Sequence, residues 1–337
     1  MQRILHLDLA RGFIVLIMPS VHVMMLYSQP VVQQSLLGDT LRFLAEGPGA
    51  QLFMFIMGAS LVLSKNITPK KVWQRTVLLI IGAFGLNLFK FNIPLDLELL
   101  PASFLLDFPL TATEFFLLGD IFHFAAIAYP LTFIVSRLTH ASIWAGFIAL
   151  TVMVVSPAIW DIHTGYKVCD QVLQYFTGGP PNVFFPVFPW LVYPLMGVVL
   201  SRMLDNKLLT TLGLMMLFVS LGLPATIERT THYRTMPADT LFHLSIVLLW
   251  LSLFRYCQRK IKANLFFRLL NFCSHNISLI YIIQWLLIFW LFSIPGYLKL
   301  SFWPTISWMS AITIATLGFT WLLTKSSTHN SQPTTPN

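Results

Sequence analysis

Apolar runs of about 20 residues follow one another along this chain and are separated by short polar segments. A helix of that length crosses the hydrocarbon core of a bilayer, which is ~30 Å thick. Charged residues make up 10% of the chain, against about 25% in soluble domains. The sequence therefore predicts an all-α integral membrane protein. It excludes soluble enzymes, collagen-like chains, disordered chains and small disulfide scaffolds.

The positions of the apolar runs predict about ten transmembrane helices in one bundle. The predicted spans are residues 12–28, 45–63, 73–91, 115–136, 140–160, 184–203, 207–227, 237–255, 270–292 and 303–323. The stretch 93–110 is also apolar, but it is interrupted by prolines and acidic residues. We therefore expect an interfacial or re-entrant segment there rather than a further span.

The Lys and Arg residues are unequally distributed between the two sides of the predicted membrane. Six of the 21 lie in segments on one side of the predicted membrane, and all the others lie on the opposite side. The six are Arg42, Lys90, Lys167, Arg229, Arg234 and Lys299. Cytoplasmic segments carry the excess of Lys and Arg, so both termini are predicted to be cytoplasmic. The net charge of +8 then reflects orientation and does not indicate a nucleic-acid partner.

The domain organisation is expected to be simple, because no internal repeat and no large soluble insertion interrupts the spans. We predict a single multi-pass transmembrane domain at 1–324 in the inner or plasma membrane of the cell. A disordered polar cytoplasmic tail is expected at 325–337. The N-terminus has no small-residue cleavage site, so its apolar run is expected to be a retained span. The three cysteines lack metal-ligand spacing, and no metal is predicted.

Arg11 and His22 are the most informative polar residues in the first span. They are eleven residues apart, which leaves a residual rotation of about 20° on an α-helix, so both lie on one face ~16 Å apart. Arg11 lies at the predicted inner rim and His22 lies near the membrane centre. Asp8, three residues before Arg11, can pair with it. Ionisable groups at membrane depth are costly, which makes this face a candidate functional site.

Other polar residues fall at membrane depth in later spans. Asp120 and His123 are three residues apart, so the carboxylate can orient the imidazole, and His123 lies ~12 Å from the outer surface, at a depth similar to that of His22. His243, Asn276, Ser278 and Gln284 are further candidates. Such groups also hold helices together by hydrogen bonds. The glycine-containing segments at 58–61 and 82–85 are expected to be close-packing positions, and aromatic runs such as 285–292 to pack or to face lipid.

Several of these residues belong to segments that resemble motifs of known protein families. Asp8-Leu-Ala-Arg11-Gly12 followed by His22 resembles the LDxxRG start and the Arg-x10-His motif of the membrane-bound acyltransferase 3 family. Four later segments resemble, in the same order, motifs of the related heparan-α-glucosaminide N-acetyltransferase-like group. They are FMFIMGASLVLS (53–64), GDIFHFAAIAYPL (119–131), FPWLVYPLMGVVLSR (188–202) and NISLIYIIQ (276–284).

The last of these motifs contains Asn276, Tyr281 and Gln284, which the resemblance makes candidate site residues. This segment also departs from the group. Gln284 stands where the group often has His, and Ile277 stands where it has Ser.

The resemblance implies an acetyl-CoA-dependent O- or N-acetyltransferase that passes an acyl group, usually acetyl, to a hydroxyl or amine of a sugar across the membrane. His22 would act as general base or would carry the acyl group itself. Asp120 and His123 would orient this imidazole or the acceptor. The phosphates of CoA would bind cations at the inner rim, namely Arg11, Lys70, Lys71 and Arg75. The acceptor would pass the segments 93–114 and 161–183.

The expected partners are therefore acyl-CoA, a sugar or glycan acceptor and membrane lipid, and a homodimer is left open. Two other classes of function also remain open. A proton-coupled secondary transporter is compatible with Asp and His near the membrane centre, although no repeated halves are found. A non-catalytic scaffold or glycan flippase of the cell envelope is the other. Binding of acetyl-CoA separates the enzyme from both.

Overall fold

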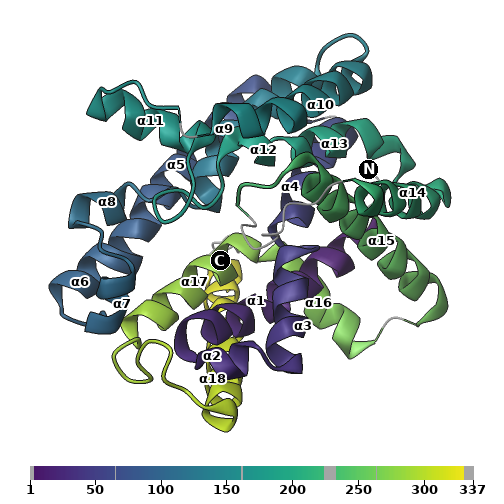
Figure 1. The fold of residues 1–337 in the computed structure, drawn as a ribbon. Helices are drawn as coiled ribbons and strands as arrows, with labels where there is room; N and C mark the ends of the chain where they lie inside the picture. The colour runs from purple at the N-terminus through teal and green to yellow at the C-terminus, as the bar shows by residue number, and fades with distance from the viewer. Residues whose placement is uncertain (1–3, 65, 161, 224–232, 263, 330–337) are drawn as a thin grey trace, which may run out of the picture. The chain divides into compact units, whose positions relative to one another are not determined.

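The computed structural model describes residues 4–64, 66–160, 162–223, 233–262 and 264–329, and these form helices joined by short connections (Figure 1). Within these ranges the extended pairings are two isolated bridges, Ser28 with Leu300 and Gly119 with Val183. The predicted all-α class is confirmed. A helix satisfies its backbone hydrogen bonds internally, which is what hydrocarbon surroundings require.

Six helical segments of the described chain are long and apolar enough to cross a membrane. They are Leu5–Tyr27, Leu36–Leu63, Pro69–Asp96, Ala141–Ile159, Pro237–Lys260 and Phe302–Ser326. A seventh span results if the bent pair Leu265–His275 and Ile277–Trp290 counts as one. Shorter apolar helices occupy Ile121–Ser136, Val187–Met203 and Leu208–Gly222. The multi-pass membrane class agrees with these helices, whereas the count of ten and the cytoplasmic termini stay predictions.

Several predicted features fall at least partly outside the described residues. These are the end of the 207–227 span, Arg229, the first residue of the 161–183 segment and the last eight residues of the 325–337 tail. The stretch 93–110, predicted to be interfacial or re-entrant, holds two short helices. The first, α6 (Ile93–Asp96), ends the candidate span Pro69–Asp96, and α7 (Ala102–Asp107) is too short to cross a bilayer.

The described residues group into two compact units. The first comprises those of Met1–Ala10, Glu46–Leu88 and Leu110–Lys262, and the second comprises those of Arg11–Ala45, Phe89–Pro109 and Ala263–Asn337. Each unit is built from segments that are far apart in the sequence. The expectation of one transmembrane domain at 1–324 stays a prediction.

The first unit is a set of helices packed in pairs. Its elements are α4 (Gly49–Leu63), α5 (Pro69–Asn87), α8 (Ala112–Phe116), α9 (Ile121–Ser136), α10 (Ala141–Ile159), α11 (Lys167–Thr177), α12 (Val187–Trp190), α13 (Val192–Leu200), η2 (Ser201–Met203), α14 (Leu208–Gly222) and α15 (Pro237–Lys260). Helix α4 packs on α13, α5 on α9, α10 on α13, and α14 on α15.

Two glycines set the distance between α4 and α13. A Cβ atom at Gly58 would lie 1.8 Å from the Pro194 carbonyl oxygen, and one at Gly197 would lie 2.0 Å from the Phe55 carbonyl oxygen. Small residues permit such close approach of helix backbones. Close packing at 58–61 is therefore confirmed. At 82–85, a Cβ atom at Gly82 would make an ordinary contact with the Phe122 ring at 3.8 Å, whereas one at Gly85 would meet no described atom beyond the backbone of its own helix within 4 Å.

The second unit joins the first long helix to the C-terminal helices. Its elements are α1 (Leu5–Tyr27) from Arg11 onward, α2 (Pro30–Gln33), α3 (Leu36–Glu46), η1 (Leu88–Asn92), α6, α7, α16 (Leu265–His275), α17 (Ile277–Trp290) and α18 (Phe302–His329). Helix α17 packs on α18, and α16 meets α17 at a bend of 83°. At the end of α1, the Tyr27 hydroxyl donates to the Ile288 carbonyl oxygen at 2.6 Å.

Replacing Gly58 by Ala should destabilise the first unit, because the added methyl group meets the backbone of α13. Overpacking of this kind costs about 1–3 kcal/mol. Gly85→Ala is the matched control, since it adds the same methyl group where no described atom beyond the backbone of its own helix lies within 4 Å. We expect a lower midpoint of thermal unfolding in detergent for Gly58→Ala and an equal or higher one for Gly85→Ala. Equal midpoints for both variants would contradict the proposed role of Gly58.

The predicted orientation can be tested with the native cysteines. Cys169 is exposed on α11, on the predicted outer side, and Cys257 is partly exposed on α15, on the predicted inner side. A membrane-impermeant maleimide should label Cys169 in intact cells and Cys257 only after permeabilisation. A Cys169→Ser variant identifies the outer label. Labelling of Cys169 only after permeabilisation would reverse the assigned orientation.

Candidate functional site

The Arg11 side chain is positioned by a close contact between α1 and α16. A Cβ atom at Gly12 would lie 1.9 Å from the Leu270 carbonyl oxygen, so only glycine permits this approach. One turn further along α16, the buried hydroxyl of Ser274 accepts from Arg11 Nε at 3.0 Å and from Nη2 at 2.9 Å. The Arg-Gly pair of the sequence motif therefore acts as one unit: the glycine brings the helices together and the arginine is anchored across the contact.

Asn276 occupies the bend that follows Ser274. Its backbone N–H reaches the carbonyl oxygens of Phe272 and Cys273, both at 3.2 Å, and its side-chain Nδ2 donates to Phe272 at 2.9 Å. These bonds satisfy carbonyl groups at the end of α16, where the helix ladder stops. In this structure Asn276 thus shapes the turn that directs α17 away from α16.

His22 stacks on the indole ring of Trp285 from α17. The ring centroids are 4.0 Å apart and the planes differ by 27°. The imidazole is half-buried, and Tyr281 packs edge-on to the same indole at 6.2 Å. An aromatic stack fixes the plane of an imidazole without occupying its nitrogens. His22 is therefore held in a defined orientation in the C-terminal half of α1.

Lys90 lies over the same indole ring. It is 3% exposed, and its Nζ is 4.3 Å from the ring centroid of Trp285 and 4.4 Å from that of Phe91. The π-helical turn η1 carries it, and such turns are frequent at functional sites. A buried cation and the imidazole of His22 thus contact one tryptophan.

Gln284 adds a further polar group to α17. Its side chain is 0% exposed, and neither its amide oxygen nor its amide nitrogen has a hydrogen-bond partner among the described residues. Leaving a buried amide unsatisfied costs roughly 1–3 kcal/mol. Such a group fits a place where a polar ligand or water completes the hydrogen bonds.

Asp120 and His123 form a capping box at the start of α9 in the first unit. Asp120 Oδ1 accepts from the Ile121 backbone N–H at 2.6 Å, and His123 Nδ1 accepts from the Asp120 backbone N–H at 3.2 Å. This bond between the pair thus uses the backbone of Asp120. When neutral, His123 then carries its proton on Nε2.

The ring of His123 is enclosed by aromatic side chains. It stacks on Tyr175 at 5.4 Å and lies edge-on to Phe84 at 4.7 Å. Burial raises the pKa of Tyr175 to about 12, so its phenol stays protonated and donates to the Leu117 carbonyl oxygen at 2.6 Å. These contacts fix the imidazole of His123 in its plane.

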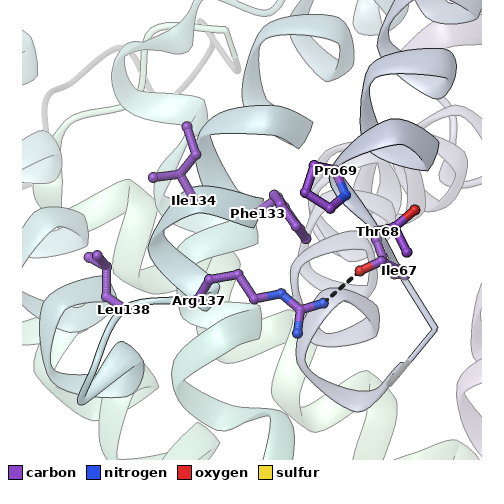
Figure 2. A pocket seen from close by; sticks show the side chains of 7 residues that line it. All are labelled: Ile67, Thr68, Pro69, Phe133, Ile134, Arg137 and Leu138. Carbon is purple, nitrogen blue, oxygen red and sulfur yellow. Dashed lines mark hydrogen bonds between the residues drawn. The ribbon is translucent and has the colours of Figure 1, made fainter.

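Three of the predicted inner-rim cations, Lys70, Lys71 and Arg75, lie on α5 and are exposed. Lys71 Nζ donates to the Asn66 carbonyl oxygen at 3.2 Å, and Arg75 Nη1 donates to the Tyr129 hydroxyl at 3.1 Å, while Lys70 precedes them in the first turn. A groove of about 600 Å³ begins at the start of α5. In it, the Arg137 guanidinium donates to the Ile67 carbonyl oxygen (Figure 2). The walls of the groove are mostly apolar, and none of the predicted site residues lines it.

The predicted site residues divide between the two units. Arg11, His22, Asn276, Tyr281 and Gln284 belong to the second unit. Those of the first unit are Asp8, Lys70, Lys71, Arg75, Asp120 and His123. Their joint action therefore stays a prediction. No three His, Cys, Asp or Glu side chains of the described chain lie close enough together to hold a metal ion.

Three residues of the second unit that contact predicted site residues or one another are not predicted from the sequence. Ser274 and Trp285 carry no signal of their own, because a serine and an aromatic residue are ordinary in a membrane helix. Lys90 does carry one, since it is the only charged residue in the apolar stretch 76–95. The charge pattern alone assigns it to the outer surface, whereas the structure buries it.

Comparison with known protein families gives a match. The family model described as heparan-alpha-glucosaminide N-acetyltransferase, catalytic, matches residues 3–221, which is more than half of the chain. The matched range includes Arg11, His22, Lys90 and His123, and it ends before α16 and α17. No curated protein and no solved structure matches the chain.

Proposed function

The chain belongs to the heparan-α-glucosaminide N-acetyltransferase catalytic family, and we propose that it moves an acetyl group from cytoplasmic acetyl-CoA to an amine or hydroxyl of a sugar on the outer side of the membrane. The observation that carries the proposal is the arrangement of α1. Arg11 and His22 lie on one helix of one unit, and side chains from α16 and α17 hold them in place.

Arg11 is proposed to bind the phosphates of CoA. A guanidinium group offers five N–H donors in a rigid fork that matches phosphate oxygens. The hydroxyl of Ser274 orients this fork by accepting from two of its nitrogens. The rise of α1 separates Arg11 from His22 by ~16 Å, which is of the order of an extended pantetheine arm. One helix then defines both ends of the bound donor.

His22 is proposed to be the general base. It takes the proton of the acceptor as the acceptor nitrogen or oxygen bonds to the thioester carbonyl carbon. The carbon–sulfur bond then breaks, and the proton passes from His22 to the departing CoA thiolate. In a two-step variant, an imidazole nitrogen attacks the thioester first and carries the acetyl group to the acceptor. Both routes need a fixed imidazole plane, and the stack on Trp285 supplies one.

The residues of the first unit have supporting roles in this proposal. Lys70, Lys71 and Arg75 attract the CoA nucleotide, and Asp8 steadies Arg11. The fixed imidazole of His123, with Asp120, orients the acceptor. Gln284 and Tyr281 line the acceptor side of α17, where the unsatisfied amide of Gln284 suits a sugar hydroxyl.

Replacing His22 by Ala should lower acetyl transfer by about 100- to 10,000-fold, the range that a general base contributes. The purified protein is assayed in detergent with labelled acetyl-CoA and amino-sugar acceptors. Acetyl-CoA binding should persist in this variant. His140→Ala, at an exposed helix start, is the control and should keep the wild-type rate. A folded His22→Ala variant with wild-type activity would end the proposal.

The role of Arg11 can be separated from that of His22 by shortening the donor. Arg11→Ala and Ser274→Ala should weaken acetyl-CoA binding by about 10-fold or more, since each removes a charge-assisted contact. Binding of S-acetylpantetheine, which lacks the nucleotide phosphates, should not change. Ser307→Ala, an exposed serine on α18, is the control. Equal losses for both donors would show that Arg11 does not bind the phosphates.

A further inference from the structure

Trp285 presents an unused hydrogen-bond donor beside His22. Its indole Nε1 is buried, and it has no acceptor among the described residues. Trp290, five residues later on the same helix, shows the ordinary arrangement, because its Nε1 donates to the Phe89 carbonyl oxygen at 2.9 Å. A buried donor without an acceptor is costly in a packed membrane helix. The buried N–H of Trp285 therefore points to an acceptor that arrives with the substrate.

The stack with His22 limits how far from the imidazole that acceptor atom can lie. The ring centroids are 4.0 Å apart and the planes differ by 27°, so the atoms of the indole, Nε1 included, are close to the imidazole. An oxygen bound to Nε1 at ~2.9 Å therefore lies next to the imidazole. A nucleophile bonded to His22 at ~2.6–3.2 Å can reach the carbon that bears this oxygen.

Lys90 adds a positive charge to the same ring. Its ammonium group lies 4.3 Å from the Trp285 ring centroid, within the range of a cation–π contact. A cation over the face draws electron density from the indole and strengthens its N–H as a donor. The site is largely withdrawn from water, where a fixed charge acts strongly on a charge that develops nearby.

We infer that Trp285 Nε1–H donates to the carbonyl oxygen of the acetyl thioester, and that Lys90 is the positioning residue that strengthens this donor. The inference rests on the proposed acetyl transfer at His22. As the acceptor attacks, the carbon–oxygen double bond of the thioester opens and its electron pair moves to the oxygen, where the indole N–H holds it. When the carbon–sulfur bond breaks, the pair returns and the thiolate leaves.

The test removes the N–H and keeps the ring. Benzothienylalanine at position 285 places sulfur where the indole has N–H, and Trp285→Phe removes the donor with natural residues. Each should lower kcat by about 100-fold, the cost of one oxyanion donor, with acetyl-CoA affinity changed less than about 3-fold. The carbonyl stretch of bound ¹³C-acetyl-CoA should move to higher wavenumber, because it loses a hydrogen bond. An unchanged stretch or an unchanged kcat would overturn the inference.

Trp290→Phe is the matched control, because it removes an indole N–H that already has a backbone acceptor. It should leave kcat within about 2-fold and the carbonyl stretch unchanged. The result for His22→Ala separates the role of Trp285 from the proposed acetyltransferase function. If His22→Ala abolishes transfer while both changes at 285 leave kcat and the stretch intact, the inference fails and the acetyltransferase proposal stands. If His22→Ala keeps transfer, the proposed function itself fails.

The role of Lys90 is tested by asking whether the effect of replacing it depends on the indole of Trp285. Lys90→Met should lower kcat about 10-fold and raise the carbonyl wavenumber, whereas Lys90→Arg should stay within about 3-fold of the wild type. In the protein that carries benzothienylalanine at 285, Lys90→Met should cost little more, since residues that act through one another are not additive. Full additivity of the two changes would show that Lys90 does not act through the indole.

Discussion

The structure depends on one constraint: hydrocarbon offers no hydrogen bonds, so every polar group inside the membrane must be held by the protein or by its ligand. This constraint makes the chain helical, and it makes each interior polar side chain informative. The guanidinium of Arg11 is anchored by Ser274, and the imidazole of His22 is stacked on Trp285. The unsatisfied groups of Gln284 and Trp285 stand out against that background.

In the second unit, contacts between helices position the Arg11 and His22 side chains of the sequence motif. The missing side chain of Gly12 lets α1 approach α16, and this contact brings Arg11 to a serine 263 residues away in the chain. The bend at Asn276 then directs α17 so that the indole of Trp285, which α17 carries, stacks on His22 of α1. The family match ends at residue 221, so the residues that hold Arg11 and His22 lie beyond it. Family membership alone therefore gives no account of how the two are positioned.

Local spacing predicts that two side chains meet but not which of their atoms bond. The three-residue spacing of Asp120 and His123 does bring them together, and the backbone N–H of Asp120 donates to the imidazole. The same spacing serves a capping box, which needs the pair at the start of a helix. The spans show a similar limit. Hydropathy locates the apolar helices of the described residues, and three of these helices are shorter than a full span.

The sequence by itself determined the membrane class, the all-helical fold and the pairing of Arg11 with His22 on one helix face. These follow from hydropathy and from the rotation of 100° per residue, which are local properties of the chain. Only the tertiary structure decided what those side chains meet. Ser274, Trp285 and Lys90 come from segments far from α1 in the sequence, and they reach it through contacts between helix backbones. No local periodicity encodes such contacts, because they depend on how whole helices pack against one another.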